Sequence, residues 1–129
     1  MKILDKESVT GIAALLVHAA RIDEKYTDNE KKLIKSFVKS YIQEENLDDI
    51  LQKAESLEQN SNQLLNFTNI IKKENDEIKS DIIRHLWKII ISDQSIDQYE
   101  SNLIRRICGL IYFSDKLSAE IKLQILNEK

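Results

Sequence analysis

The sequence predicts a single all-α domain spanning residues 1–129, and three features support this prediction. The chain contains no proline and only two glycines, so few residues would interrupt a helix. Both glycines, Gly11 and Gly109, fall inside stretches with helical apolar periodicity. The third feature is that apolar residues recur at helical spacing along nearly the whole chain. A chain of this length can bury a substantial core.

About seven helices are expected, and the first four are defined by their apolar stripes. The first, residues 7–22, has the stripe Ile12, Ala13, Leu16, Val17, Ala19 and Ala20. The second, residues 28–44, has Leu33, Ile34, Phe37, Val38, Tyr41 and Ile42. The third, residues 48–58, has Ile50, Leu51, Ala54 and Leu57. The fourth follows the polar break at residues 60–62 and has Leu64, Leu65, Phe67, Thr68 and Ile71.

The last three helices follow the charged run at residues 72–77. The fifth, residues 77–92, has the stripe Ile82, Ile83, Leu86, Trp87, Ile89 and Ile90. The sixth begins after Asp97 and reaches Tyr112, with the stripe Leu103, Ile104, Ile107, Cys108, Ile111 and Tyr112. The seventh is expected to begin after Ser118 as its cap, with Ile121, Ile125 and Leu126 inward.

The sequence repeats itself at an offset of 93 − 23 = 70 residues, between residues 23–34 and residues 93–104. Each copy has an acid, a short polar stretch, a second acid seven residues later and then an apolar pair. The stripes of the first and second helices also match those of the fifth and sixth. The sequence therefore predicts two pseudo-repeated αα-hairpins, joined by a two-helix connector and packed around one core.

Composition argues against several classes of function. A net charge of −3 and a pI near 5.5 argue against nucleic-acid binding, which usually requires a basic face. The longest uninterrupted apolar run, residues 89–91, is too short to cross a bilayer, and the N-terminus has no signal-peptide core. We therefore expect a cytoplasmic protein without membrane insertion. Cys108 is the only cysteine and is expected in the core. Because no nucleophile–base pair or phosphate loop is present, we expect no enzyme activity.

These features together resemble the TerB-like family, which is named for the tellurite-resistance protein TerB and includes the N-terminal domain of DjlA co-chaperones. The resemblance covers nearly the whole chain and is closest to the stand-alone bacterial members. It is carried by an apolar helix ending in Ala20-x-x-Asp23, by a second helix opening with Glu30 and Leu33-Ile34, and by residues 64–68, 86–88 and 97–107.

The resemblance implies an all-α fold of about seven helices and a cation site formed by acidic residues of the two inter-helix loops. It also implies a role in stress response or as a scaffold, and no established enzyme activity. The chain departs from the family at each loop, where members often have glycine after the acid. Here Glu24 follows Asp23 and Gln94 follows Asp93. Since glycine adopts a left-handed turn at no steric cost, the loop geometry is expected to differ.

Carboxylates are suitable ligands for Ca²⁺, Mg²⁺ or Mn²⁺, and one reading makes the repeated acids a divalent-cation site. The candidate metal ligands are Asp23, Glu30, Asp93 and Glu100, with Asp28 and Asp97 as secondary candidates. The alternative interpretation explains some of these acids by contacts within a single helix start. Residues 27–30 form a capping-box sequence and residues 97–100 have the same form, so both glutamates have a structural explanation.

Asp23 and Asp93 are harder to explain as structural residues. Each lies at the C-terminal end of a predicted helix, where the helix dipole disfavours a negative charge. Two functions therefore remain open. One is a non-enzymatic module that binds a divalent cation through the two loops. The other is a protein-interaction or co-chaperone-type adaptor domain in which the acids only cap helices. Both would act with protein partners.

Overall fold

The computed structural model describes residues 5–22, 26–42, 46–60, 65–92 and 98–128, and for residues 98–101 it describes the backbone only. Within these ranges the chain forms seven helices and no strand, which confirms the predicted all-α class. The helices are α1 (Lys6–Ala20), α2 (Asp28–Tyr41), α3 (Leu47–Asn60), α4 (Leu65–Lys72), α5 (Asp76–Ile91), α6 (Gln98–Ile111) and α7 (Asp115–Asn127). None of the described helices is long and apolar enough to cross a membrane.

Polar side chains define where several helices begin. The Asp5 carboxylate accepts from the Ser8 amide at the start of α1, and the Asn75 side chain accepts from the Ile78 amide at the start of α5. These caps satisfy backbone amides that have no partner inside the helix, and a cap is worth about 1 kcal/mol. Because Asn75 is its cap, α5 starts at Asp76, inside the charged run at residues 72–77.

The predicted start of the last helix was wrong. Its cap is Ser114, whose hydroxyl accepts from the amides of Lys116 and Leu117, and not Ser118. Ser118 lies one turn inside α7 and is buried, 4% exposed. A serine one turn into a helix resembles a cap in sequence, since both are followed by helical apolar periodicity.

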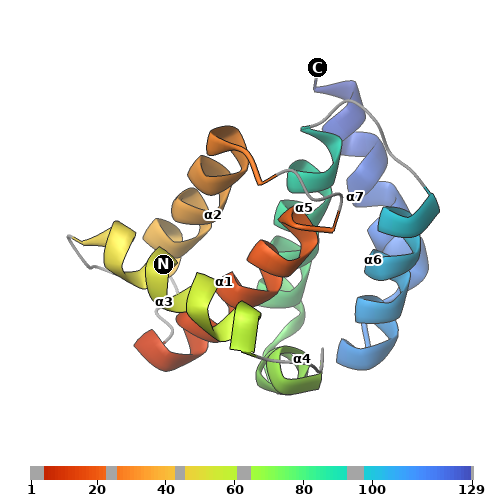
Figure 1. Ribbon diagram of the computed structural model, residues 1–129. Coiled ribbons are helices and arrows are strands. Elements are labelled where there is room, and N and C mark those ends of the chain that lie inside the picture. Colours follow the sequence, from red (N-terminus) through yellow and green to blue (C-terminus); the bar gives the residue numbers. More distant parts are fainter. Residues whose placement is uncertain (1–4, 23–25, 43–45, 61–64, 93–97, 129) are drawn as a thin grey trace.

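The core is organised around α1 and α5 (Figure 1). Helix α1 packs against α2, α3, α4 and α5, whereas α5 packs against α1, α2, α6 and α7. From Val9 to Ala20, every residue of α1 except His18 is buried, so α1 is covered on nearly all sides. The predicted core positions of Trp87 and Cys108 are confirmed, since Trp87 is 5% exposed and Cys108 is fully buried.

Four residues that were predicted to face the core are exposed: Leu57, Leu65, Tyr112 and Leu126. All four lie in the first or last turn of a helix or directly after it, where fewer neighbouring helices cover the side chain. Leu57 is the first residue of the last turn of α3 and is 45% exposed.

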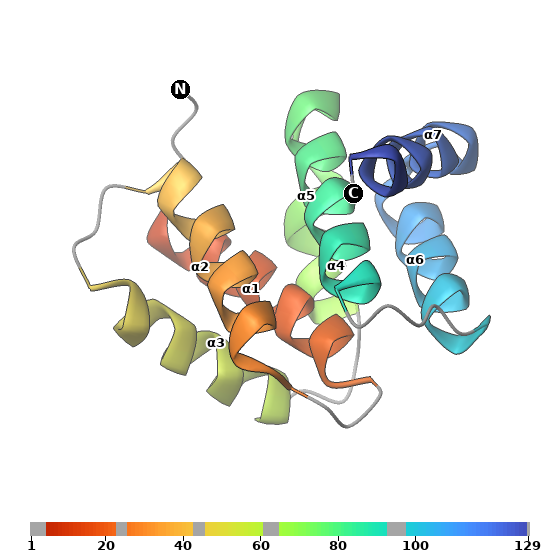
Figure 2. The ribbon, with the colours of Figure 1, turned by 90° about the horizontal axis from the view of Figure 1, so that it is seen from above.

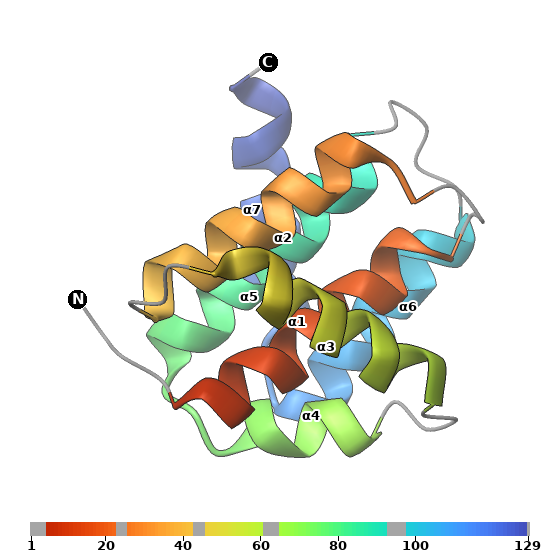
Figure 3. The same cartoon turned by 60° about the vertical axis from the view of Figure 1, so that its left-hand side comes forward.

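The expected hairpin partners contact one another, since α1 packs on α2 and α5 packs on α6. Helices α3 and α4 lie between the two pairs in sequence, as predicted. The figures show α1 and α5 running in the same general direction, with their C-terminal ends at one end of the molecule (Figures 1 and 3). The pseudo-repeat relation between the two pairs remains an interpretation of the sequence.

Candidate functional site

The predicted acidic site lies partly outside the described residues. Asp23, Asp93 and Asp97 fall in the ranges 23–25 and 93–97, which the structure does not describe. Glu100 lies in α6, but its side chain is not described either. Of the six candidate ligands, Glu30 and Asp28 are therefore the two whose side-chain surroundings are described.

Glu30 forms the predicted capping box at the start of α2. Its amide donates to the Thr27 hydroxyl at 3.1 Å, and its Oε1 accepts from the Thr27 amide at 2.8 Å. The Thr27 hydroxyl also lies 3.0 Å from the same oxygen. Glu30 is only 1% exposed, although its side chain is a carboxyl group. These contacts confirm the structural role of Glu30. Asp28, one residue into α2, is exposed.

The helix ends that flank both loops meet at one end of the molecule. The C-terminal ends of α1 and α5 and the first turns of α2 and α6 lie there together, as the view from above also shows (Figure 2). A hollow of about 350 Å³ lies here between the C-terminal end of α1 and α6. Its walls are His18 and Ile22 on the α1 side and Asn102, Leu103 and Arg106 on α6. Ile22 directly precedes Asp23, and Asn102 follows Glu100 by two residues.

Basic side chains surround the C-terminal end of α1. The Arg21 guanidinium donates to Glu58 Oε1 at 2.6 Å, and His18 Nδ1 lies 3.2 Å from Glu58 Oε2. The guanidinium also lies 5.1 Å from the centre of the Tyr26 ring, within range of a cation–π contact. Burial raises the pKa of Tyr26, so its hydroxyl stays protonated. A cation at a helix C-terminus interacts favourably with the helix dipole, so Arg21 has a structural role at this position.

The described residues do not by themselves form a metal site. Among them, no group of three or more His, Cys, Asp and Glu side chains has the geometry to hold an ion. A cation site at this end of the molecule would therefore need at least one of the carboxylates whose surroundings are not described, Asp23, Asp93, Asp97 or Glu100. The four-acid site remains a prediction.

Cys108 shows the features of a structural cysteine. Burial raises the pKa of its thiol to about 11, so the thiol is protonated at neutral pH. A protonated thiol is a weak nucleophile, and this agrees with the expected core role.

A partly buried polar cluster between α2 and α5 was not predicted from the sequence. The Tyr41 hydroxyl donates to Asp81 Oδ2 at 2.5 Å, and His85 Nδ1 contacts the Asp81 carbonyl oxygen at 2.9 Å. The spacing of Asp81 and His85 by one helical turn was visible in the sequence. The contact of Asp81 with Tyr41, 40 residues earlier, depends on the packing of α2 against α5.

The chain was compared with protein families, with curated proteins and with solved structures. The family model described as Tellurite resistance protein TerB matches residues 10–123. No curated protein and no solved structure matches. The matched range includes the apolar part of α1, both loop regions and most of α7. The chain therefore belongs to the TerB family.

Proposed function

We propose that this TerB-family chain is a non-enzymatic module that binds a divalent cation, Ca²⁺, Mg²⁺ or Mn²⁺, between its two inter-helix loops. Asp23 and Asp93 are the principal ligands in this proposal, and Glu30 and Glu100 are further ligands. Asp28 and Asp97 are secondary ligands. Cation binding would regulate contact with a protein partner in a stress response.

One observation carries the proposal. The hollow between Ile22 and Asn102 indicates that the residues flanking both loops belong to the same end of the molecule. Calcium requires about six to eight oxygen ligands and magnesium about six, often including waters. One loop supplies too few carboxylates for such a site, so two loops at one end are a precondition for it.

Electrostatics provides further support. The C-terminal ends of α1 and α5 lie together, and each helix carries partial negative charge at its C-terminus (Figures 1 and 3). An aspartate following each of these ends adds to a negative potential that a divalent cation would neutralise. Arg21 offsets part of this potential, but it already pairs with Glu58.

Thermal unfolding in the presence of calcium, magnesium or manganese chloride tests the proposal. An ion that binds only the folded state raises stability, by about 2.7 kcal/mol at 100 times the dissociation constant. We expect a rise in Tm with at least one ion and none with the Asp23→Asn/Asp93→Asn double variant. No rise with any of the three ions at millimolar concentration would overturn the proposal.

The matched control is Asp76→Asn/Asp115→Asn. Both residues are exposed acids in the first turns of α5 and α7, so this variant changes net charge equally without altering the loops. It should keep the full cation-induced rise in Tm. If it loses the rise as completely as the loop variant does, cations act through general charge screening and the proposed site is wrong.

A further inference from the structure

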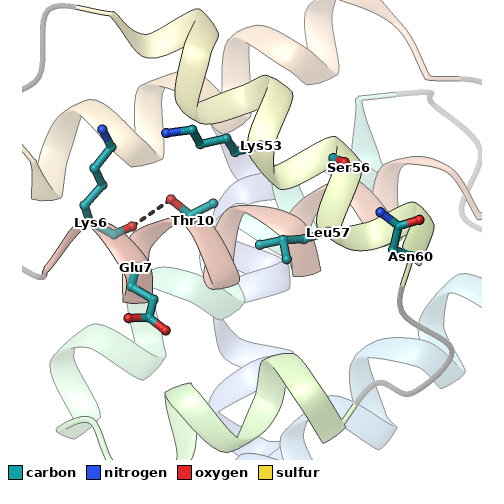
Figure 4. Close-up of a pocket in the computed structure, with 7 residues that line it drawn as sticks. All are labelled: Lys6, Glu7, Thr10, Lys53, Ser56, Leu57 and Asn60. Carbon is teal, nitrogen blue, oxygen red and sulfur yellow. Dashed lines mark hydrogen bonds between the residues drawn. The ribbon is translucent and has the colours of Figure 1, made fainter.

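A groove runs along the N-terminal half of α1, between α3 and α4. It consists of two adjoining hollows of about 560 Å³ and 380 Å³, and both are lined by Glu7, Leu57 and Asn60. The larger lies between the N-terminal half of α1 and the C-terminal half of α3 (Figure 4). The smaller extends to Phe67 and Ile70 on α4. We call the two hollows together the α1/α3/α4 groove.

Leu57 is an apolar residue without a full set of core neighbours. It continues the α3 stripe that buries Ile50, Leu51 and Ala54, yet it is 45% exposed. Figure 4 shows its side chain extending across the groove toward Thr10 of α1. Exposed leucines are common, but this one is centred in a concave surface, which is the usual position of an interface anchor.

Gly11 lines the part of the groove near α4, where the two helices approach closely. A Cβ atom at this position would lie 2.4 Å from Ile70 Cδ1, so glycine permits the close approach of the α4 side chain to α1. Phe67, which also lines this part, is 6% exposed. The groove therefore has a packed apolar floor.

The charged side chains of the groove are separated in space. Lys6 and Lys53 lie at one end, and Figure 4 shows both ammonium groups extending to the same side. The Lys53 side chain is 55% exposed. Its ammonium group lies 3.5 Å from the Asp49 carboxylate, in an ion pair that is open to solvent. The Glu7 carboxylate points away from the two lysines, toward the α4 side. This distribution is complementary to a ligand that has an apolar centre and negative charge at the end near the lysines.

We infer that the α1/α3/α4 groove binds an amphipathic helix of a partner protein, with apolar residues packed around Leu57 and an acidic residue facing Lys6 and Lys53. On α3 the groove extends from Lys53 to Asn60, about 10 Å along the helix axis, which matches two turns of a bound helix. Helices bind such grooves through apolar anchors spaced by three or four residues. The inference is independent of the proposed cation site, because the α1 residues that line the groove all lie in the N-terminal half of that helix.

Two synthetic helical peptides of about 14 residues test the inference. Both carry the same apolar stripe of leucines, and one has glutamates at both ends where the other has lysines. Fluorescence anisotropy should show the glutamate peptide binding at least about tenfold more tightly than the lysine peptide. The Lys6→Glu/Lys53→Glu variant should reverse this preference. The control Lys32→Glu/Lys116→Glu, which changes net charge equally at exposed positions elsewhere, should keep it.

The position of the bound peptide is measured by methyl NMR. The methyl signals of Leu57 and Ile70 should shift on titration, and those of Leu123, which is 58% exposed on α7, should not. Leu57→Asn should weaken binding about tenfold, whereas Leu123→Asn should leave it unchanged. Circular dichroism of each variant checks that the fold is retained.

Three results would overturn the inference. The first is no binding of either peptide at about 1 mM, the weak limit for a specific complex. The second is equal binding by the wild type and Lys6→Glu/Lys53→Glu, which would indicate non-specific apolar adsorption. The third is binding to anionic lipid vesicles that depends on the two lysines, without discrimination between the peptides, which would assign the groove to a lipid surface.

Discussion

The indole N–H of Trp87 on α5 donates a hydrogen bond of 2.9 Å to the hydroxyl of Ser118 on α7, and both side chains are buried. This bond joins the last helix to the centre of the core. It also explains why a serine one turn inside α7 points inward, since a buried indole N–H requires an acceptor.

Replacing Ser118 by alanine should destabilise the protein by about 1–3 kcal/mol, because it leaves the Trp87 N–H buried without its acceptor. In a Trp87→Phe background the same substitution should cost much less, since no donor remains. Urea unfolding of the two single variants and the double variant gives the coupling free energy between the residues. Additive effects would show that the hydrogen bond contributes nothing to stability.

Glu30→Ala should lower the free energy of unfolding by about 1 kcal/mol, because the Thr27 amide loses its acceptor in the capping box. Glu30→Gln should cost less than Glu30→Ala, since the amide oxygen can still accept that hydrogen bond. Chemical denaturation of the two variants measures the difference. Equal losses would show that the charge of Glu30, rather than its hydrogen bonding, stabilises α2.

Glu30→Gln also tests whether Glu30 binds the proposed cation in addition to capping α2. Glu30→Gln retains the fold but has a weaker oxygen ligand. A smaller calcium-induced rise in Tm in this variant than in the wild type would assign Glu30 to the bound ion, whereas an unchanged rise would restrict the site to the other carboxylates.

Tyr112→Gly should stabilise the protein by up to about 1 kcal/mol. Tyr112 follows α6 with φ of 60°, in the left-handed region, while the Phe113 amide donates to the Cys108 carbonyl at 2.9 Å. This is the Schellman geometry that glycine favours. Lys72 lies 5.3 Å from the centre of the tyrosine ring, and loss of that exposed contact offsets part of the gain.

Tyr112→Ala is the control for this effect. Alanine also removes the ring but keeps a Cβ in the left-handed conformation, so it should destabilise while glycine stabilises. Thermal unfolding of both variants tests this difference in sign. Destabilisation by glycine as large as that by alanine would show that the ring contact outweighs the backbone strain.

Stability should fall below about pH 6.5 because of His85. Burial lowers the pKa of His85 below its ordinary value of 6.5, and the neighbouring charges of Lys88 and Arg84 act in the same direction. The hydrogen bond with Asp81 opposes this shift but does not cancel it. As the pH falls through 6.5, the unfolded chain takes up a proton at this position before the folded protein does, so the free energy of unfolding decreases.

Unfolding measured from pH 7.5 to 5.5 in the wild type and in His85→Gln checks this expectation, with a slope from one such group of at most about 1.4 kcal/mol per pH unit. The variant should show a shallower decrease. A decrease of the same steepness in both proteins would assign the pH dependence to other groups.

The helices could be predicted from sequence because their stripes and caps are local. The capping box at Thr27 and Glu30 needs only residues three apart, and it was recognised in the sequence and confirmed in the structure. The apolar stripe of α5 likewise identified Trp87 as a core residue. Leu57 and Ser118 were misassigned because the sequence does not say which neighbouring helix covers a given turn.

In the candidate sites, too, some features could be predicted from the sequence and others depend on tertiary structure. The repeat identified Asp23 and Asp93 as functional candidates because their charge has no local explanation at a helix C-terminus. The hollow between Ile22 and Asn102, and the groove around Leu57, depend on helices that are distant in sequence. No periodicity within one helix could have located them.

The sequence by itself determined the all-α class, most of the helix positions, the buried stripes and the capping role of Glu30, because these depend on interactions within about one or two helical turns. Tertiary structure decided the surroundings of each side chain. It placed Ser118 against Trp87, left Leu57 exposed in a groove and brought Tyr41 to Asp81. The physical reason is that burial and hydrogen bonding between helices depend on which faces pack together, and that choice is made by the whole core at once.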